Sequence, residues 1–357
     1  MSFSFGFNND DISDDEVEGR HQENTPVESP LVALSASLDS KVLPKLHTLE
    51  SILSELQNVK LTFDNYMTPI GGNVTYRREL FDIKHQVMCE DEQSDLVNDI
   101  LMGNSNDVDL KKDVYEGGFK SWECSYDAVD KLVQLYQQPE FNKATILDLG
   151  CGTALPSCQI LMQRLQNKTL ALNKSTRMTL ILSDFNYEVL RLVTVPNLLI
   201  HWASTVDPKK LHELTQNEES EGPVMANDEL LLTPRLLEEF MEHLKQENIE
   251  IQFISGSWGQ EFLEILSNLG NSIDLVISSE TIYSLDTLPI VAETILKLLE
   301  TNNSCLGLIA AKNFYFGVGG SVAEFVNYIN KKDTSVIVNV NEVNSQLKRS
   351  LVEVYKA

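Results

Sequence analysis

The sequence lacks the marks of a secreted, membrane-spanning or metal-binding protein. Its 357 residues contain no run of 18 apolar residues, and the first residues hold neither a basic stretch nor a continuous apolar one. A membrane helix and a secretory signal are therefore not expected. The five cysteines form no C-x-x-C pair and have no zinc-like spacing with histidine. We predict no metal site and a reducing compartment, with a cytoplasmic and nuclear localisation.

Positive charge is also scarce. Lys and Arg number 28 against 53 Asp and Glu, which gives a formal net charge of −25. The first 60 residues contribute −7 (4 bases against 11 acids), so −18 falls on the rest of the chain and the acidity is not confined to one tail. Such a field repels nucleic acid and attracts basic partners. We expect a monomer that acts on a basic protein and binds neither free nucleic acid nor a membrane. An acidic surface that serves only solubility is the alternative.

The composition divides the chain into three parts. Residues 1–40 are rich in Asp, Glu, Ser and Asn and predict a disordered acidic tail. Residues 41–112 form an N-terminal extension of helix and hairpin character, and residues 113–357 form the main domain. The main domain carries an insertion at 204–248.

Local periodicity gives finer expectations for the extension and the insertion. Apolar residues recur with a helical period over 41–60, alternate loosely over 75–90, and indicate a further helix near 91–101. In the insertion, the first half is acidic and loop-like, whereas residues 234–245 have a helical pattern.

From residue 144 onward, short apolar stretches alternate with helical segments. The predicted strands are 145–149, 179–183, 249–254, 273–278, 305–311, 335–340 and 350–355, with helices over 154–165 and from 186. Strands separated by helices predict a doubly wound, seven-stranded, mostly parallel sheet of the α/β, Rossmann-like class. The last two strands leave no room for a crossover helix, so they should form a hairpin with one antiparallel member.

A glycine loop ends the first predicted strand and opens the first helix. It reads Asp148-Leu149-Gly150-Cys151-Gly152, and its glycines allow a sharp turn and the close approach of a ligand. The third glycine of a dinucleotide motif is missing, because Leu155 stands there. Asp148 would repel a pyrophosphate but suits a cationic ligand, which favours S-adenosylmethionine. The alternative is a tight turn that binds nothing.

Polar residues follow the next two strands. Asp184 comes after the second strand, 32 residues beyond Gly152, and an acid at this strand end is typical of ribose binding. Its alternative role is to cap the following helix. Ser257 and Trp258 follow the third strand, where they are expected beside the adenine, unless they only form a packed turn.

The fourth strand is followed by Glu280 and Tyr283. Ligands of open α/β sheets bind outside the carboxyl ends of the strands, so this pair is expected to face the reacting group. An ordinary capping cluster is the alternative.

Together these motifs resemble a known family. They are Glu116-Gly117-Gly118-x-Lys120-x-Trp122-Glu123-Cys124, Asp148-Leu149-Gly150-Cys151-Gly152, Asp184-x-Asn186, Ser279-Glu280-Thr281-Ile282-Tyr283 and Ala311-Lys312-x-x-Tyr315-Phe316-Gly317-Val318-Gly319-Gly320. The set resembles the eukaryotic protein-histidine methyltransferases of the seven-β-strand class over about residues 60–357 and at the Phe-rich start. The likeness extends to the fungal enzyme that modifies a histidine in the third protein of the large ribosomal subunit.

The resemblance implies a role for each matching residue. The methionine end of the cofactor would contact Ser121, Trp122, Glu123, Cys124 and Ser125, and the loop of Asp148, Gly150 and Gly152 would lie under the cofactor. The nucleoside end would be held by Asp184, Phe185, Asn186, Ser257 and Trp258. Ser278 would line the floor, Glu280 and Tyr283 would be catalytic, and the loop 316–320 would shape the peptide groove.

Two other functions remain open from the sequence. Glu280-x-x-Tyr283 resembles the acid-x-x-tyrosine motif of related lysine methyltransferases with Glu in place of Asp, so a lysine could be the target. A non-catalytic chaperone of a ribosomal protein would also suit an acidic surface. For the histidine enzyme, the resemblance implies a role in ribosome biogenesis or translation.

Overall fold

The computed structural model describes residues 33–34, 42–90, 117–169, 172, 174–216 and 228–357. The predicted helix near 91–101 and most of the acidic tail lie outside these residues. None of the described helices is long and apolar enough to cross a membrane. The described part also holds no cluster of His, Cys, Asp and Glu suited to a metal ion.

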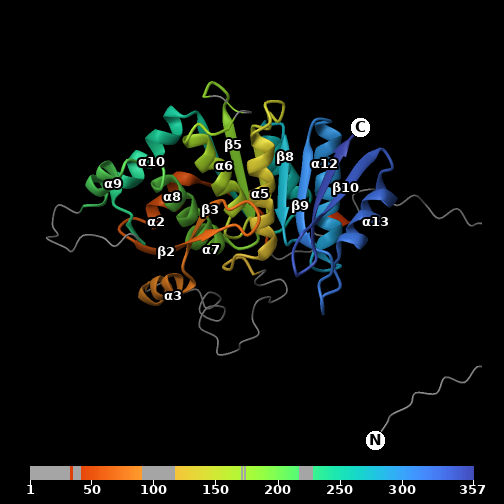
Figure 1. Cartoon of the computed structure of the whole chain (residues 1–357), viewed down its shortest axis with the longest axis horizontal. Coiled ribbons are helices and arrows are strands. Elements are labelled where there is room, and N and C mark those ends of the chain that lie inside the picture. Colours follow the sequence, from red (N-terminus) through yellow and green to blue (C-terminus); the bar gives the residue numbers. More distant parts are fainter. Residues whose placement is uncertain (1–32, 35–41, 91–116, 170–171, 173, 217–227) are drawn as a thin grey trace, which may run out of the picture.

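A sheet of eight strands forms the centre of the molecule (Figure 1). In spatial order they are β1 (Lys45–Thr48), β7 (Ile249–Ser255), β5 (Met178–Asp184), β4 (Thr145–Leu149), β8 (Leu275–Ser279), β9 (Leu306–Lys312), β11 (Arg349–Lys356) and β10 (Val336–Val343). The five strands from β7 to β9 are parallel, and β11 runs antiparallel to β9 and pairs with β10 as a hairpin. The predicted doubly wound sheet and its closing hairpin are confirmed.

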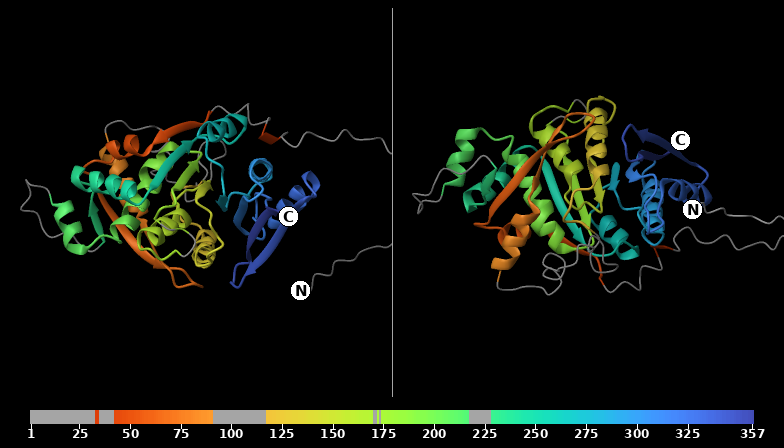
Figure 2. Two further views of the ribbon diagram at one scale, coloured as in Figure 1. Left: turned by 90° about the horizontal axis from the view of Figure 1, so that it is seen from above. Right: turned by 60° about the horizontal axis from the view of Figure 1, so that its bottom comes forward.

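Helices cover both faces of this sheet, as the turned views show (Figure 2). One face packs against α5 (Glu123–Tyr136), α6 (Leu155–Leu165), α8 (Val195–Ala203) and α10 (Pro234–Gln246), and the other against α11 (Gln260–Asn268), α12 (Thr287–Thr301) and α13 (Val322–Lys332). Neighbouring strand residues point to opposite faces, so Ile146 joins the first core and Leu147 the second. Both faces are apolar, which is why the strands read as continuous apolar runs.

The N-terminal extension corrects two sequence predictions. The helix expected over 41–60 begins only at Leu49, because Lys45–Thr48 pairs with the edge strand β7 as an eighth strand. The Thr48 hydroxyl then accepts a hydrogen bond from Ser51 N (3.2 Å) and starts α2 (Leu49–Glu55). The alternation over 75–90 predicts a strand or hairpin, and β3 (Val74–Arg78) does pair antiparallel with β2 (Lys60–Met67), but α3 (Leu80–Cys89) follows it.

The insertion and the extension combine in a second, small sheet. Its order is β3, β2 (Lys60–Met67) and β6 (Glu229–Leu231), and β6 comes from the insertion. The first half of the insertion is not only loop, since Asp207 accepts hydrogen bonds from two backbone amides and begins α9 (Pro208–Thr215). The predicted second helix is α10.

Two residues of the predicted acidic tail, Ala33 and Leu34, are among the described residues. Leu34 is fully buried in the core formed with α12 and α13. The amides of Ala33 and Leu34 donate to the buried Glu293 carboxylate at 3.0 and 3.1 Å. A buried carboxylate is stable only when its oxygens accept hydrogen bonds, so this contact anchors the tail at one point.

The second helical region after β5 is not uniform. It consists of α7 (Tyr187–Val189), a π-helical turn η2 (Leu190–Thr194) and α8. The wide turn brings the Thr194 hydroxyl to the Gly152 carbonyl, to which it donates at 2.6 Å. The helix therefore fastens the glycine loop from the side.

Candidate active site

The predicted site residues meet at the carboxyl edge of the parallel strands. The carboxyl ends of β4, β5, β7 and β8, with the loops that follow them, carry all of them except the segment 121–125, which leads into α5. Because parallel strands end at one edge of a sheet, these loops come together even though they are distant in the sequence.

The glycine loop is a tight turn with no room for side chains. Gly150 and Gly152 have φ of 74° and 50°, a conformation that favours glycine. The amides of Gly150 and Cys151 both donate to the Ser183 carbonyl at 2.8 Å. A Cβ on Gly150 would lie 2.5 Å from Thr281 Cγ2 and 3.0 Å from the Trp258 ring. Thr281 and Trp258 thus already fill the space in which a side chain at position 150 would lie, so this position requires glycine.

Asp148 lies beneath this loop rather than on it. The side chain is buried, and its Oδ2 accepts a hydrogen bond from Ser157 Oγ on α6 at 2.6 Å. Burial raises the pKa of Asp148 to about 7, against the opposing effect of the Ser157 hydrogen bond. From this position Asp148 would attract a cationic ligand electrostatically, without touching it.

Asp184 connects the loops of β4 and β5. Its Oδ2 accepts from Gly152 N at 3.0 Å, and its Oδ1 accepts from Asn186 N at 3.1 Å. Burial raises the pKa of Asp184 to about 6, although the amide donors favour the ionised form. The N-cap residue of the next helix is Asn186, and no side chain caps that helix. The alternative capping role of Asp184 is therefore wrong, and its ribose role stays a prediction.

Residues after β7 face the glycine loop. Trp258 Nε1 donates to Ser183 Oγ at 3.0 Å, which fixes its ring beside Gly150. Ser257 donates from both its amide (3.1 Å) and its hydroxyl (2.7 Å) to the Val42 carbonyl. Phe185 contributes its carbonyl, which accepts from Gly256 N at 3.0 Å. Sequence reasoning had assigned no role to Ser183 or to Val42.

Ser278 joins two strand ends, and its expected place in the floor of the cofactor site stays a prediction. Its hydroxyl is fully buried, donates to the Leu149 carbonyl at 2.9 Å, and shares a hydrogen bond with Thr281 Oγ1 at 2.6 Å. These bonds join the end of β8 to the end of β4. Thr281, which was quoted in a motif without a role, thereby holds its methyl group over Gly150.

The segment that begins α5 closes the site from another side. Ser121 Oγ donates to Thr153 Oγ1 at 3.1 Å, and Trp122 Nε1 donates to the Gly117 carbonyl at 3.1 Å. Ser125 Oγ donates to the Trp122 carbonyl at 2.6 Å. Cys124 is buried, and burial together with the Glu280 carboxylate raises the pKa of its thiol. This thiol stays protonated and is not a nucleophile.

Glu280 is held in an unusual backbone conformation. Its φ is 60°, which costs about 1 kcal/mol or more for a residue with a side chain. The Glu280 amide donates to the Ala310 carbonyl at 2.9 Å. Its Oε1 accepts from Cys124 N at 3.3 Å, and its Oε2 accepts from the Tyr315 hydroxyl at 2.7 Å. A strained backbone that several hydrogen bonds hold in place is typical of functional sites.

Lys312 and Tyr315 complete the charge pattern around Glu280. Lys312 Nζ lies 3.7 Å from Glu280 Oε1 and 3.0 Å from Glu123 Oε2, and it stands 5.2 Å from the centre of the Trp122 ring. Burial would lower the pKa of Lys312, but the two carboxylates raise it, so it stays charged. The sequence signal for both residues was their place after the carboxyl end of the fifth strand.

Tyr283 contacts the second core through its ring and the glycine-rich loop through its backbone. Its ring is half-buried against the second core, and its carbonyl accepts from Gly320 N at 2.9 Å. The hydroxyl that donates to Glu280 belongs to Tyr315. Tyr283 therefore anchors the glycine-rich loop, and its catalytic role stays a prediction.

Comparison with known proteins decides the family. No family model matches the chain. It is similar to histidine protein methyltransferase 1 of Saccharomyces cerevisiae, with 40% identity over 99% of this chain and 98% of that protein. The Schizosaccharomyces pombe protein of that name is 35% identical over 79% and 77%, and the Bos taurus homolog is 30% identical over 72% and 60%.

The chain belongs to the histidine protein methyltransferase 1 family. This confirms the predicted enzyme class, a protein methyltransferase, and a protein as its substrate. Among solved structures it is similar to magnesium protoporphyrin IX methyltransferase from Synechocystis PCC 6803 with bound SAM, with 10% identity, 78% of this chain and 91% of that chain covered, and a TM-score of 0.33. It is also similar to the O-methyltransferase TomG from Streptomyces achromogenes in complex with SAM, with 11% identity, coverage of 67% and 92%, and a TM-score of 0.35.

The residues present fit S-adenosylmethionine, the cofactor that the sequence predicts. The buried Asp184 carboxylate lies at the carboxyl end of β5 and accepts a hydrogen bond from Gly152 N at 3.0 Å, so a ribose hydroxyl bound there would meet an acceptor next to the glycine loop. Segment 121–125 would hold the methionine end, and Asp184 with Asn186 the ribose. When bound, the cofactor supplies a methyl group on a positively charged sulfur.

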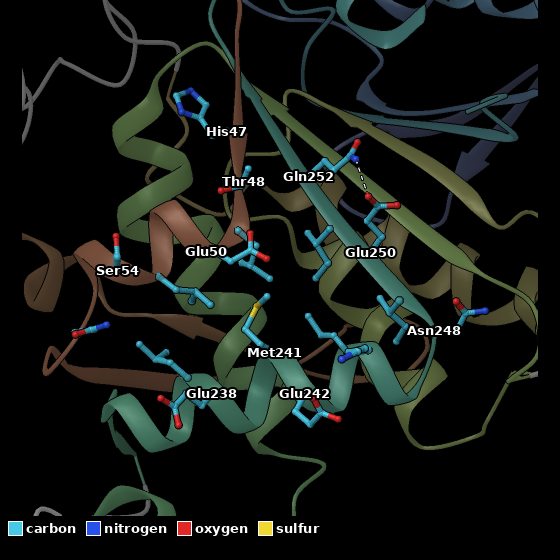
Figure 3. A pocket seen from close by; sticks show the side chains of 18 of the residues that line it. His47, Thr48, Glu50, Ser54, Glu238, Met241, Glu242, Asn248, Glu250 and Gln252 are labelled. Atoms are coloured by element: carbon cyan, nitrogen blue, oxygen red, sulfur yellow. Dashed lines mark hydrogen bonds between the residues drawn. The ribbon is translucent and has the colours of Figure 1, made fainter. Parts of the chain in front are cut away.

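A cavity of about 830 Å3 lies apart from the carboxyl edge of the sheet. Figure 3 shows that three parts of the chain surround it: β1 together with α2, then α10, and the first residues of β7. Labelled side chains on its walls include Glu50, Glu238, Met241 and Glu242. It contains none of the predicted site residues and is separate from the carboxyl edge.

Proposed function

We propose that this enzyme methylates a histidine in a basic protein of the large ribosomal subunit, as a monomer in cytoplasm and nucleus, and thereby serves ribosome biogenesis or translation. The net charge of −25 supports a basic substrate, because opposite charges accelerate encounter. The family supports histidine as the target residue.

The observation that carries the proposal is the anchored carboxylate of Glu280. Two donors, Cys124 N and the Tyr315 hydroxyl, each bond to one oxygen. A carboxylate offers about four acceptor sites, so each oxygen keeps one for a substrate N–H. Glu280 is mostly buried at the carboxyl edge, next to the segment 121–125 that would hold the methionine end.

The chemistry requires alignment more than base catalysis. An imidazole with a pKa of about 6.5 is mostly neutral at pH 7, so its free nitrogen already has a lone pair. We propose that Glu280 accepts a hydrogen bond from the ring N–H and thus selects the tautomer whose other nitrogen faces the methyl group. That nitrogen would accept the methyl group that the cofactor supplies, with the electron pair of the broken bond left on the sulfur, and the ring would become cationic. Glu280 stabilises that cation until the ring proton leaves to water.

An apolar rim beside Glu280 supports a polypeptide substrate. The rim consists of exposed Leu285, Phe314, Phe316 and Val318. The rings of Phe314 and Phe316 pack at 4.9 Å between centroids, and a Cβ on Gly319 would lie 3.5 Å from Leu285. Exposed apolar clusters of this kind mark interaction sites. The proposed peptide groove thus runs along the loops after β8 and β9.

The test is a labelling experiment. Purified enzyme is incubated with methyl-labelled S-adenosylmethionine and a ribosomal-protein extract from cells that lack the gene, and the labelled protein is hydrolysed to amino acids. We expect methylhistidine on one basic large-subunit protein. Methyllysine would replace histidine as the target, and absence of label despite measured cofactor binding would favour the chaperone alternative.

A further inference from the structure

The N-terminal strand β1 pairs with β7, and the residues just before β1 contact the loop that follows β7. Four residue pairs join the two strands, from Lys45 with Ser255 to Thr48 with Gln252. Just before β1, the Val42 carbonyl accepts both hydrogen bonds donated by Ser257. The main chain that precedes β1 therefore lies directly on a residue predicted to flank the adenine.

Gly256 is the point where this contact leaves no space. Its φ is 100°, and a Cβ there would lie 2.5 Å from the Leu43 carbonyl oxygen and 2.8 Å from Pro44 Cα. The Gly256 amide also donates to the carbonyls of Asp184 (3.1 Å) and Phe185 (3.0 Å). One glycine thus joins three segments: the N-terminal arm, the loop after β5 and the loop after β7.

A second set of contacts ties the arm to the loop after β5. His47 Nε2 shares a hydrogen bond with Ser255 Oγ at 2.7 Å, and its ring lies 4.6 Å from the Tyr187 ring between centroids. The Tyr187 hydroxyl donates to Glu55 Oε1 on α2 at 2.5 Å. Tyr187 stands directly after Asn186, one of the predicted ribose residues. The unit from Val42 to Glu55 therefore bridges both loops.

We propose that residues Val42–Glu55 are part of the cofactor site. Their backbone at Val42–Pro44 forms a wall of the adenosine half, and His47 with Glu55 keeps the loops after β5 and β7 at a fixed spacing. The ligand chemistry is the purine nucleoside that S-adenosylmethionine and its demethylated product share. The inference rests on the position of the cofactor and is independent of which residue of the substrate receives the methyl group.

The test compares two glycine variants by calorimetric titration with S-adenosylhomocysteine. Gly256→Ala places a methyl group against Leu43. Gly270→Ala is the control, because Gly270 also has a positive φ (70°) but a Cβ there meets nothing within 4 Å. We expect the Kd to rise about tenfold in Gly256→Ala, or about 1.4 kcal/mol, and less than twofold in the control. Wild-type affinity in Gly256→Ala would overturn the proposal.

A second variant separates an effect on cofactor affinity from a general loss of folding stability. Tyr187→Phe removes only the hydroxyl that binds Glu55 and keeps the ring on His47. We expect adenosine and S-adenosylhomocysteine to weaken by the same factor of about three, while the ligand-free Tm changes little. A loss confined to S-adenosylhomocysteine would place the effect at the methionine end and contradict the proposal. Because no methyl acceptor is present, a wrong assignment of the substrate would not alter either result.

Discussion

Glu280 is the residue at which strain, burial and hydrogen bonding coincide. Its left-handed backbone is stabilised by the Ala310 carbonyl, and its carboxylate by Tyr315 and Cys124. The sequence located Glu280 because strand ends can be predicted from apolar runs. It could not show that Tyr315, from another loop, would reach the carboxylate, because that contact depends on how the loops after β8 and β9 fold together.

The role of Tyr315 can be tested by removing its hydroxyl. Tyr315→Phe leaves Glu280 without one donor, so we expect kcat to fall about tenfold, the loss of one charge-assisted hydrogen bond, while the Kd of S-adenosylhomocysteine stays unchanged. Tyr328→Phe is a matched control, because that hydroxyl donates to the buried Glu293 carboxylate at 2.6 Å away from the site. Equal losses of kcat in both variants would show a general effect of deleting buried hydroxyls.

Asp148 gives a prediction about pH and stability. Its pKa is raised from 3.8 to about 7 by burial. The folded chain therefore binds a proton more tightly than the unfolded chain between these values, and this residue lowers the free energy of unfolding as pH rises through that window. Asp148→Asn cannot ionise, so its Tm relative to wild type should increase between pH 5 and pH 8.

Thermal unfolding followed by circular dichroism measures this difference. Asp333→Asn is the control, because Ser335 lowers the pKa of that exposed carboxyl and it stays ionised at both pH values. Its Tm difference from wild type should be the same at pH 5 and pH 8. Parallel curves for wild type and Asp148→Asn would mean that Asp148 does not titrate in this range.

At the scale of elements, the loop after β9 is the part most exposed to a substrate. Phe316 is 86% exposed, yet it belongs to a loop fastened through Gly320 to Tyr283. A large apolar side chain that contributes nothing to the core is available for binding. Because the loop is held in place, it can present a preformed surface to a protein substrate.

Replacing the aromatic ring tests this loop. Phe316→Ser should raise KM for the protein substrate about tenfold, since central aromatic residues often contribute more than 1 kcal/mol to an interface. The Tm and the Kd for S-adenosylhomocysteine should not change. Phe81→Ser on α3, where Phe81 is 76% exposed, should leave KM unaltered. If steady-state kinetics show the same KM for both variants, the rim does not bind substrate.

Elements also show where sequence reasoning succeeds and where it fails. The parallel strands were located within one or two residues, because buried strands have continuous apolar runs that few other elements share. Lys45–Thr48 was taken for helix because its apolar residues continue the period of α2. This segment is a strand only because it pairs with the edge strand β7, which is distant in the sequence. The π-helical turn at Leu190–Thr194 has no local signal of that kind.

At the scale of the whole molecule, charge is the dominant property. The net charge of −25 creates a field that extends beyond any single contact. Such a field affects how fast a basic protein arrives more than how tightly it is held, and salt screens it over about 8 Å at physiological ionic strength.

Salt dependence therefore tests the proposed basic substrate. Raising NaCl from about 50 mM to about 300 mM should lower kcat/KM for a basic ribosomal protein about tenfold. The Kd for S-adenosylhomocysteine, a ligand without net charge, should change little. If kcat/KM is insensitive to salt while methylation proceeds, the acidic surface serves solubility and not recognition.

The cysteines have a practical consequence. Cys124, Cys151, Cys158 and Cys305 are buried and Cys89 is exposed, and all five are free thiols. Burial raises the pKa of the four buried thiols, which keeps them from reacting as thiolates. A maleimide dye should consequently attach at Cys89 on α3 alone. The unmodified chain thus carries a single natural position for a fluorescent reporter, and the reporter would not disturb the predicted cofactor site, next to which Cys124 and Cys151 are buried.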